Sequence, residues 1–459
     1  MLKDLKFQIF FLILVILFIL SAISSAVTYQ NLNEEYQTDL NRHHERVSDG
    51  ESMKMIDLLN NNALSVLNSP SPALLFNRFD TYPDKLRVNI MFYTPFFSNY
   101  RTTMTREVFH LNWFFILGIL SSFIMLIMSF EAISHEKRAG TLRLLSIIGF
   151  KRQTMLWHKY ISYMLLYFIV IIPPALVSMI LFFVLTGTWS VIFMLKFLLI
   201  LLISVPFASF FIWLGILISM SKNYRNAIVM VVFIWLFFVI IIPQSANIIA
   251  KHISPIKTTV EYNEMKRNAY WEEYQVWAEE YGTRVGGNGN LHDGLRARAF
   301  HACDEKMSHI NQLEIDDSIR QTKIIQNISA LSPFAQFEKI AEVVFDKGFY
   351  MFNYMQETAK RSIVQISNLM KEQDSRDETS LHLFYKGASG DRYVLSSIGQ
   401  IPFSAQHFEH PNLLFVTEIE TEDGFAKAVR VILRLLPILI LNILLMFLSV
   451  VRFEKLDIR

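Results

Sequence analysis

Six long apolar runs divide this chain, and they restrict its fold more than any other feature of the sequence. A helix needs about 20 apolar residues to cross the hydrocarbon core of a bilayer, and each run reaches about that length. Apolar residues make up 52% of the 459 residues, and they are concentrated in these blocks. We therefore expect a mainly α protein: a polytopic six-helix transmembrane domain with a mostly helical extracytoplasmic domain. The runs span residues 7–27, 111–130, 161–185, 189–220, 227–250 and 431–451.

A signal peptide is the alternative for the first run. The apolar region of a signal peptide has about 7–15 residues and ends in small residues near a cleavage site. Residues 7–27 are longer, although small residues occur at 21–22 and 24–26. We favour an uncleaved membrane anchor.

The polar segment between the second and third runs orients the bundle. Within residues 131–160, six Lys and Arg residues outnumber the two acidic residues, Glu131 and Glu136. Short loops with an excess of basic residues stay on the cytoplasmic side. Six spans then leave both termini in the cytoplasm. Lys196, near the start of the long fourth run, is expected at the outer headgroup level with its stem directed toward water.

This topology divides the chain into five parts. These are residues 1–29 with the first span, 30–110 as a small extracytoplasmic loop domain, 111–250 with spans two to five, 251–426 as a large extracytoplasmic domain, and 427–459 with the sixth span and a cytoplasmic tail. The fourth part is long enough to be a domain of its own. Because Cys303 is the single cysteine, no intrachain disulfide can stabilise it.

Helical periodicity runs through the first half of the large outer domain. Aromatic and apolar residues at three- and four-residue spacing predict a helix near residues 265–281, and the glycine-rich residues 286–289 end it. A second helix is expected over about residues 293–330.

A capping signal opens the second half of this domain. Ser332 followed by Pro333 has the form of an N-cap residue and the first residue of a helix. In a further helix, apolar residues from Phe352 to Met370 repeat at three and four residues, as expected for a helix packed on one side. After Asp374 the pattern weakens to turns and short strands.

A motif of acidic, glycine and leucine residues lies within residues 131–160. It reads E-x-x-x-x-E-x-x-x-G-T, followed by a leucine-rich turn and His158-Lys159. Thr141 can cap a short helix that carries too many apolar groups for a free loop, so the helix needs a partner. The pattern resembles the intracellular coupling segment of ABC-2-type transporter permeases, in which a Gly-Lys pair stands where this chain has His158-Lys159.

In that family the coupling segment forms an amphipathic helix that lies in a groove of a separate ATPase subunit. The resemblance implies the same role for residues 141–150, and we refer to residues 131–160 as the coupling segment. An ordinary basic interfacial helix attracted to lipid headgroups is the competing interpretation. The residues expected to couple to the ATPase are Glu131, Glu136, Lys137, Arg138, Gly140, Thr141, Leu144, Leu145, Arg152 and Lys159.

The outer domain carries a looser resemblance. The order LSPFAQFEKIAEVV at 331–344, a long helix, and IPFS at 401–404 is similar to a subgroup of ABC-2 permeases with a large extracytoplasmic domain between the fifth and sixth spans. That subgroup is related to permeases of gliding-motility and nitrous-oxide-reductase maturation loci. The resemblance implies a bacterial inner (cytoplasmic) membrane, an ABC ATPase subunit as partner, and a second permease subunit, either identical or related.

Several chemistries lack a motif in this sequence. No GxxxxGK[ST] phosphate loop occurs, so ATP and Mg²⁺ are expected in the partner ATPase and no cofactor in this chain. No GxSxG nucleophile motif supports a hydrolase, and we expect no catalytic residues. The histidines match no zinc spacing, so no metal site is expected. Lys and Arg form many short clusters instead of one basic face, which argues against nucleic acid.

The interiors of the six runs contain no Asp or Glu, which disfavours ion-coupled transport. Polar residues within the runs either line a path or make their hydrogen bonds within their own helices. The candidates for a path are Ser204, Ser209 and Asn442. The sequence therefore favours the non-catalytic permease subunit of an ABC-2-type exporter of unknown substrate. The alternative is a mechanotransmitting or assembly protein that passes ATPase motion to an extracytoplasmic protein partner without transport.

Overall fold

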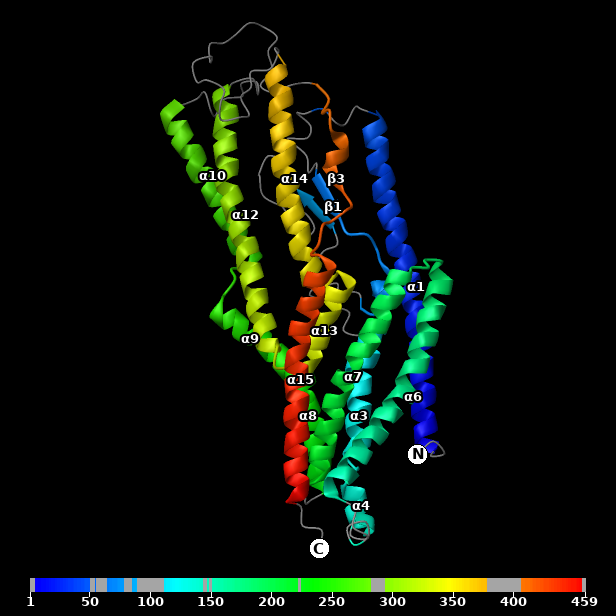
Figure 1. Ribbon diagram of the computed structural model, residues 1–459. Coiled ribbons are helices and arrows are strands. Elements are labelled where there is room, and N and C mark those ends of the chain that lie inside the picture. The colour runs from blue at the N-terminus through cyan, green and yellow to red at the C-terminus, as the bar shows by residue number, and fades with distance from the viewer. Residues whose placement is uncertain are drawn as a thin grey trace.

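The computed structural model describes residues 5–49, 54, 64–77, 85–88, 111–142, 147, 151–221, 224–281, 294–377 and 406–455. The protein is elongated, with a bundle of helices at one end and long helices projecting from the other (Figure 1). The first and last helices both reach the end of the bundle that lies opposite these projecting helices.

Within the described residues, six helices are long and apolar enough to span a membrane, which confirms the mainly α, polytopic fold. They cover Phe11–Glu45, Phe115–Arg138, Arg152–Thr186, Val191–Ser219, Asn226–Ile253 and Gly424–Glu454. The corresponding elements are α1 (Leu5–Asp49), η2 (Phe115–Leu120) with α3 (Ser121–Ser129) and α4 (Ser134–Arg138), α6 (Arg152–Thr186), α7 (Val191–Ser219), α8 (Tyr224–Leu236) with η3 (Phe237–Ile241) and α9 (Ile242–Ile253), and α15 (Gly424–Glu454). Both η2 and η3 are π-helical turns within longer helices.

The first helix is longer than the first apolar run. α1 has 45 residues, which at 1.5 Å per residue corresponds to about 68 Å. The boundary expected at residue 29 therefore lies inside a continuous helix. No glycine or proline interrupts the polar residues 30–49, so the helix continues beyond the thickness of a bilayer.

A small sheet joins two regions that lie far apart in the sequence. β1 (Leu64–Leu67) pairs antiparallel with β2 (Lys85–Val88) and parallel with β3 (Phe415–Val416). The outer part of α1 packs against this sheet, because Lys85 forms an ion pair with Asp39 and the ring of His43 stacks on Phe415 at 4.4 Å. The described strands within residues 30–110 thus pack with residues that precede the last span.

The outer hairpin consists of α10 (Thr259–Tyr281) and α12 (Gly294–Ser329), which confirms the two helices predicted there. Thr258 and Glu261 form a capping box at its start, in which each side chain accepts a hydrogen bond from the other residue's backbone N–H. The hairpin packs on the rest of the protein mainly through α12 and α9. The glycines at 286–289 lie outside the described residues.

Two further helices follow the hairpin. Ser332 caps α13 (Pro333–Phe345) by accepting a hydrogen bond from the Ala335 N–H at 3.2 Å, as predicted. α14 (Gly348–Arg376) buries the predicted apolar face against the small sheet. Short 3₁₀ turns, η1 (Pro72–Leu75) and η5 (Pro411–Leu414), complete the outer part.

Hydrogen bonds between side chains satisfy polar groups inside the bundle. The Tyr167 hydroxyl donates to Ser204 at 2.7 Å, and the Tyr160 and Ser209 hydroxyls lie 2.8 Å apart. Asn442 donates to the Pro206 carbonyl at 2.9 Å. Because polar groups find no water in the hydrocarbon core, these contacts favour a packing role for Ser204 and Ser209 over a path lining. The buried Asn442 Oδ1 has no hydrogen-bond partner among the described residues.

Candidate functional site

The described part of the coupling segment stands at the end of the bundle opposite the outer hairpin (Figure 1). Span two continues past Phe130 through a turn into the short helix α4. Ala132, Ile133 and Leu142 are buried and anchor the segment against the spans, whereas residues 137–141 are exposed. The segment thus has a buried base, at residues 132, 133 and 142, and an exposed tip, at residues 137–141.

Glycine at position 140 is required by the turn that follows α4. Gly140 has a φ of +73°, a left-handed conformation that strains residues with a Cβ atom. Its N–H donates to the Lys137 carbonyl at 3.3 Å, and the Thr141 hydroxyl donates to the Glu136 carbonyl at 3.2 Å. The Thr141 hydroxyl thus closes the turn after α4. The cap that the sequence predicts for the next helix stays a prediction, because residues 143–146 lie outside the described residues.

An ion pair joins the coupling segment to the third span. Glu136, in α4, pairs with Lys159, in the first turns of α6, and both side chains are partly buried. Glu131 and Glu136 also lie within electrostatic range of the Tyr163 hydroxyl, one turn further along α6. Two of the predicted residues are thus brought together, and they tie α4 to α6.

Arg152, in the first turn of α6, contacts the C-terminal end of α15 in the same chain. Its guanidinium donates to the carbonyls of Phe453 and Glu454, at 3.3 and 2.6 Å, and Gln153 donates to the Glu454 carboxylate at 2.7 Å. A cation at a helix C-terminus is favoured by the helix dipole. Arg152 therefore links the coupling segment to the end of α15, a contact that no spacing in the sequence indicates.

The remaining predicted residues divide into two groups. Lys137 and Arg138 are exposed on α4, and Arg138 donates to the Ser134 carbonyl at 3.4 Å. Leu144 and Leu145 lie outside the described residues, as does most of the helix predicted over 141–150. Thr141, Leu142 and Ile147 are helical.

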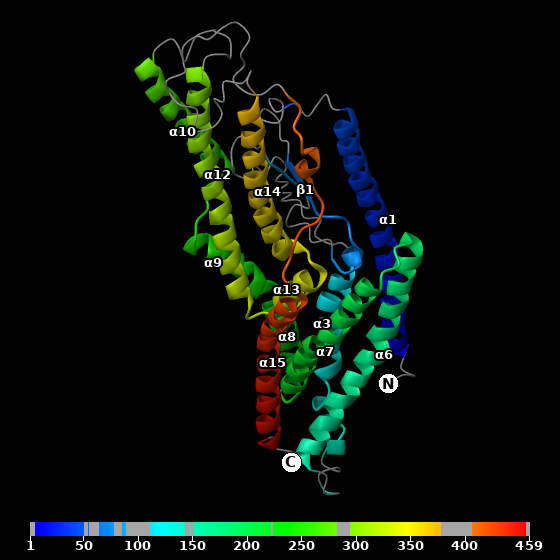
Figure 2. The same ribbon diagram turned by 45° about the horizontal axis from the view of Figure 1, so that its top comes forward.

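The other end of the bundle holds a feature that sequence reasoning missed. α13 was expected in the outer domain, yet it packs into the apolar core of the spans (Figures 1 and 2). The Phe337 ring is fully buried, stacks on Phe207 of α7 at 4.9 Å and meets Phe76 edge-on at 5.7 Å. Eight of its thirteen residues are apolar, a signal that matches a buried helix as well as an amphipathic outer one.

The start of α13 contacts both π-helical turns of the spans. The Ser332 hydroxyl donates to the Phe238 carbonyl of η3 at 2.6 Å. At η2, the Phe334 ring lies where a Cβ atom on Gly118 would be 2.8 Å away. A π-helical turn changes the backbone hydrogen-bond pattern of a helix and often marks a functional site. α13 thus begins in direct contact with the second and fifth spans.

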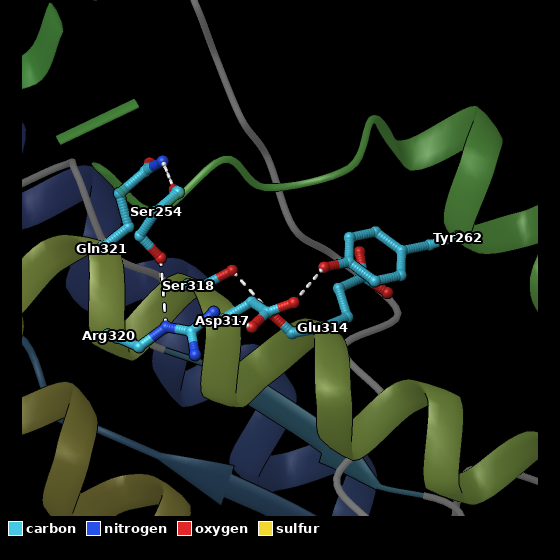
Figure 3. Close-up of polar contacts among 7 residues, drawn as sticks. All are labelled: Ser254, Tyr262, Glu314, Asp317, Ser318, Arg320 and Gln321. Atoms are coloured by element: carbon cyan, nitrogen blue, oxygen red, sulfur yellow. Dashed lines mark hydrogen bonds and ion pairs between the residues drawn. The ribbon is translucent and has the colours of Figure 1, made fainter. Parts of the chain in front are cut away.

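A polar clamp joins the fifth span to the outer hairpin. At the end of α9, the Ser254 hydroxyl accepts from Arg320 at 3.1 Å and its carbonyl accepts from Gln321 at 2.8 Å. Nearby, the Tyr262 hydroxyl of α10 donates to Asp317 of α12 at 2.8 Å (Figure 3). Burial, and then the hydrogen bond to Asp317, raise the pKa of Tyr262 above its ordinary value.

Metal-ligand residue types do not converge in the described part of the chain, where no three His, Cys, Asp or Glu residues are grouped for an ion. Cys303 is buried in α12 and His407 forms a single β-bridge with Lys54. The described contacts instead tie helix ends together by charge and pack α13 into the bundle.

Sequence comparison assigns a family over nearly the whole length. The model of the family described as "ABC-2 family transporter protein" matches residues 1–458. No curated protein and no solved structure matches the chain.

Proposed function

This chain belongs to the ABC-2 family of transporter proteins, and we propose that it couples ATP hydrolysis by a separate ATPase chain to the export of a substrate as a permease subunit. The observation that carries the proposal is the coupling segment. Its exposed tip is available to a partner, while the Glu136–Lys159 ion pair and the Arg152 contacts with α15 tie its base to the third and sixth spans.

In this proposal the ATPase holds ATP and Mg²⁺, because this chain has no phosphate loop of its own. Closure of an ATPase pair displaces the coupling segment at the cytoplasmic face of a bacterial inner membrane, where both termini also lie. α3 follows through the turn that leads into α4, α6 follows as a continuous helix, and α15 follows through Arg152. A second permease subunit, identical or related, completes the transporter. The large region between the fifth and sixth spans supports membership of the subgroup with an extracytoplasmic domain.

The second candidate function is mechanotransmission, in which ATPase motion reaches an extracytoplasmic protein partner and nothing crosses the membrane. It is favoured by the two junctions at the outer end. α13 is wedged among the spans, and the clamp at Ser254 fastens the hairpin to α9. Movement of the spans must therefore displace the outer helices.

Co-purification tests the proposal. The tagged protein is isolated from native membranes in mild detergent, and a variant carrying Lys137→Glu and Arg138→Glu is treated identically. Reversing two exposed charges at the tip leaves the buried anchors intact, so we expect the ATPase to be recovered with the wild type and lost from the variant. The matched control, Lys257→Glu with Lys323→Glu, reverses two exposed charges near the outer hairpin and is expected to retain the ATPase. Equal recovery in all three samples contradicts the proposal.

A second experiment separates the two functions. ATP hydrolysis of the reconstituted complex is measured in liposomes with candidate substrates and with extracts of outer-side proteins. Export predicts stimulation by a substrate, whereas mechanotransmission predicts stimulation only by a protein that binds the outer domain. Alanine at Glu131 and at Glu136 is expected to lower the stimulated rate in either case, because both carboxylates lie at the base of the coupling segment.

A further inference from the structure

One carboxylate at the corner between α13 and α14 holds two lysines from two different spans. Oδ2 of Asp346 lies 2.8 Å from Lys196 Nζ of α7, and Oδ1 lies 2.7 Å from Lys427 Nζ at the start of α15. The three side chains are each only 20–25% exposed. Lys196 was expected simply to reach water, but its ammonium is paired.

The backbone of this corner is shaped to present the carboxylate. Asp346 has a φ of +55° and Gly348 a φ of +63°. Aspartate and asparagine are among the few residues other than glycine that enter this left-handed region at a moderate cost. The Lys347 N–H donates to the Glu342 carbonyl at 3.0 Å, which closes the end of α13.

Apolar contacts reinforce the ion pair between the same two elements. Phe345 precedes Asp346, and Phe197 follows Lys196. The rings of these two phenylalanines lie 5.0 Å apart, and Phe345 also packs on Phe76 at 5.5 Å. The outer end of α7 and the C-terminal end of α13 are therefore joined by adjacent charged and aromatic pairs.

The outer end of the sixth span makes further contacts through charged side chains. Beyond Lys427, the same side of α15 carries Arg430, which pairs with Glu422, and Arg434, which donates to Gln326 of α12 at 3.3 Å. In the described residues, Asp346 is the acidic group that binds cations of both α7 and α15. Without its charge, both lysines lose the ion pair with Asp346, and Lys427 keeps only the more distant attraction of Glu422.

We propose that Asp346 is a positioning residue that latches the outer ends of the fourth and sixth spans to α13. Its release must precede any separation of those spans. The ion pairs of this latch lie entirely within this chain. The idea that they open during ATP hydrolysis rests on the proposed function. Lys196 and Lys427 each supply half of the latch, so loss of either lysine weakens it and loss of the carboxylate removes it.

Hydrogen exchange of the full-length protein in lipid nanodiscs tests the latch. Asp346→Asn keeps the shape and tolerates the left-handed backbone, but it removes the charge. We expect amides of residues 333–345 to exchange about tenfold faster than in the wild type, because opening energies of local units set exchange rates and tenfold corresponds to about 1.4 kcal/mol. Amides in the distal half of α14 are expected to keep their rates.

Lys196→Gln and Lys427→Gln are expected to raise exchange in the same residues by about threefold each, within the range of partly exposed ion pairs. The control, Glu372→Gln, removes an exposed ion pair with Arg376 on α14 and is expected to leave residues 333–345 unchanged. If Asp346→Asn does not yield folded protein, the two lysine variants carry the same test.

Unchanged exchange in all three latch variants overturns the proposal, and so does faster exchange that is uniform along the chain. Neither result depends on an ATPase. Conversely, failure to recover an ATPase in the co-purification contradicts the proposed function and leaves the exchange result standing. The two ideas therefore fail separately.

Discussion

The outer part of this protein is attached to the bundle at two junctions of opposite chemical character. α13 is held by buried aromatic packing against α7, by the two π-helical turns and by Asp346. The α10–α12 hairpin is joined to the end of α9 by hydrogen bonds of Ser254 with Arg320 and Gln321. Buried aromatic packing resists small displacements, whereas a part-buried hydrogen bond of this kind contributes only about 1 kcal/mol net. We therefore expect α13 to move with the spans and the hairpin to pivot at the end of α9.

The strongest test of this contrast is Phe337→Ala. The Phe337 ring is fully buried between Phe207 and Phe76, and truncating a core phenylalanine costs about 3–5 kcal/mol. We expect a loss of that size in the free energy of unfolding, measured by denaturant titration in mixed micelles. Phe425→Ala is the control, because the Phe425 side chain is 82% exposed and its loss should cost less than about 0.5 kcal/mol. Equal losses in both variants contradict the close packing of α13 against the spans.

Gly118→Ala probes the close approach of α13 to the second span. The added Cβ atom meets the Phe334 ring at 2.8 Å, so the ring must shift within a packed site. Overpacking of this kind costs about 1–3 kcal/mol, and the same titration measures it. Gly424→Ala adds a methyl group in open space and should be neutral. A neutral Gly118→Ala indicates that α13 yields easily, which removes the distinction between the two junctions.

Tyr262→Phe tests the polar junction. The variant removes the hydroxyl that donates to Asp317, which is expected to cost about 1 kcal/mol. We expect faster hydrogen exchange in α10 and in residues 314–321, with no change in residues 333–345. Gln312→Ala, which breaks a hydrogen bond within α12 alone, serves as the control. Faster exchange that spreads into α13 shows that the two junctions are coupled.

The smallest expected effect is a pH dependence of the hairpin. The pKa of Tyr262 is raised in the folded protein, so the folded state keeps the phenol proton where the unfolded state loses it. Linkage then makes the stability of the hairpin constant below about pH 10, the ordinary tyrosine pKa, and lower as pH rises above it. Hydrogen exchange corrected for the intrinsic effect of pH measures this slope, which the Tyr262→Phe variant should reduce. An unchanged slope in the variant assigns the dependence to other groups.

Much of the fold follows from patterns within single segments. Six spans, the helices of the outer hairpin, the Ser332 cap and the buried face of α14 were all predictable, because near neighbours in the sequence decide helix periodicity and capping. The ATPase-coupling role of residues 131–160 stays a prediction from their motif, and Leu144 and Leu145 lie outside the described residues. No local pattern indicates where α1 ends, since its polar outer half is as helical as its apolar half.

The partners of these elements were decided only by the tertiary structure. The sequence determined that Lys196, Arg152 and Asp346 are charged and that α13 is apolar. It did not determine that Lys196 meets Asp346, that Arg152 binds the end of α15, or that α13 enters the bundle. Pairing across 150 or 300 residues depends on which surfaces complement each other once the helices have packed. An apolar face predicts that a helix is buried, but it does not predict which surface covers that face.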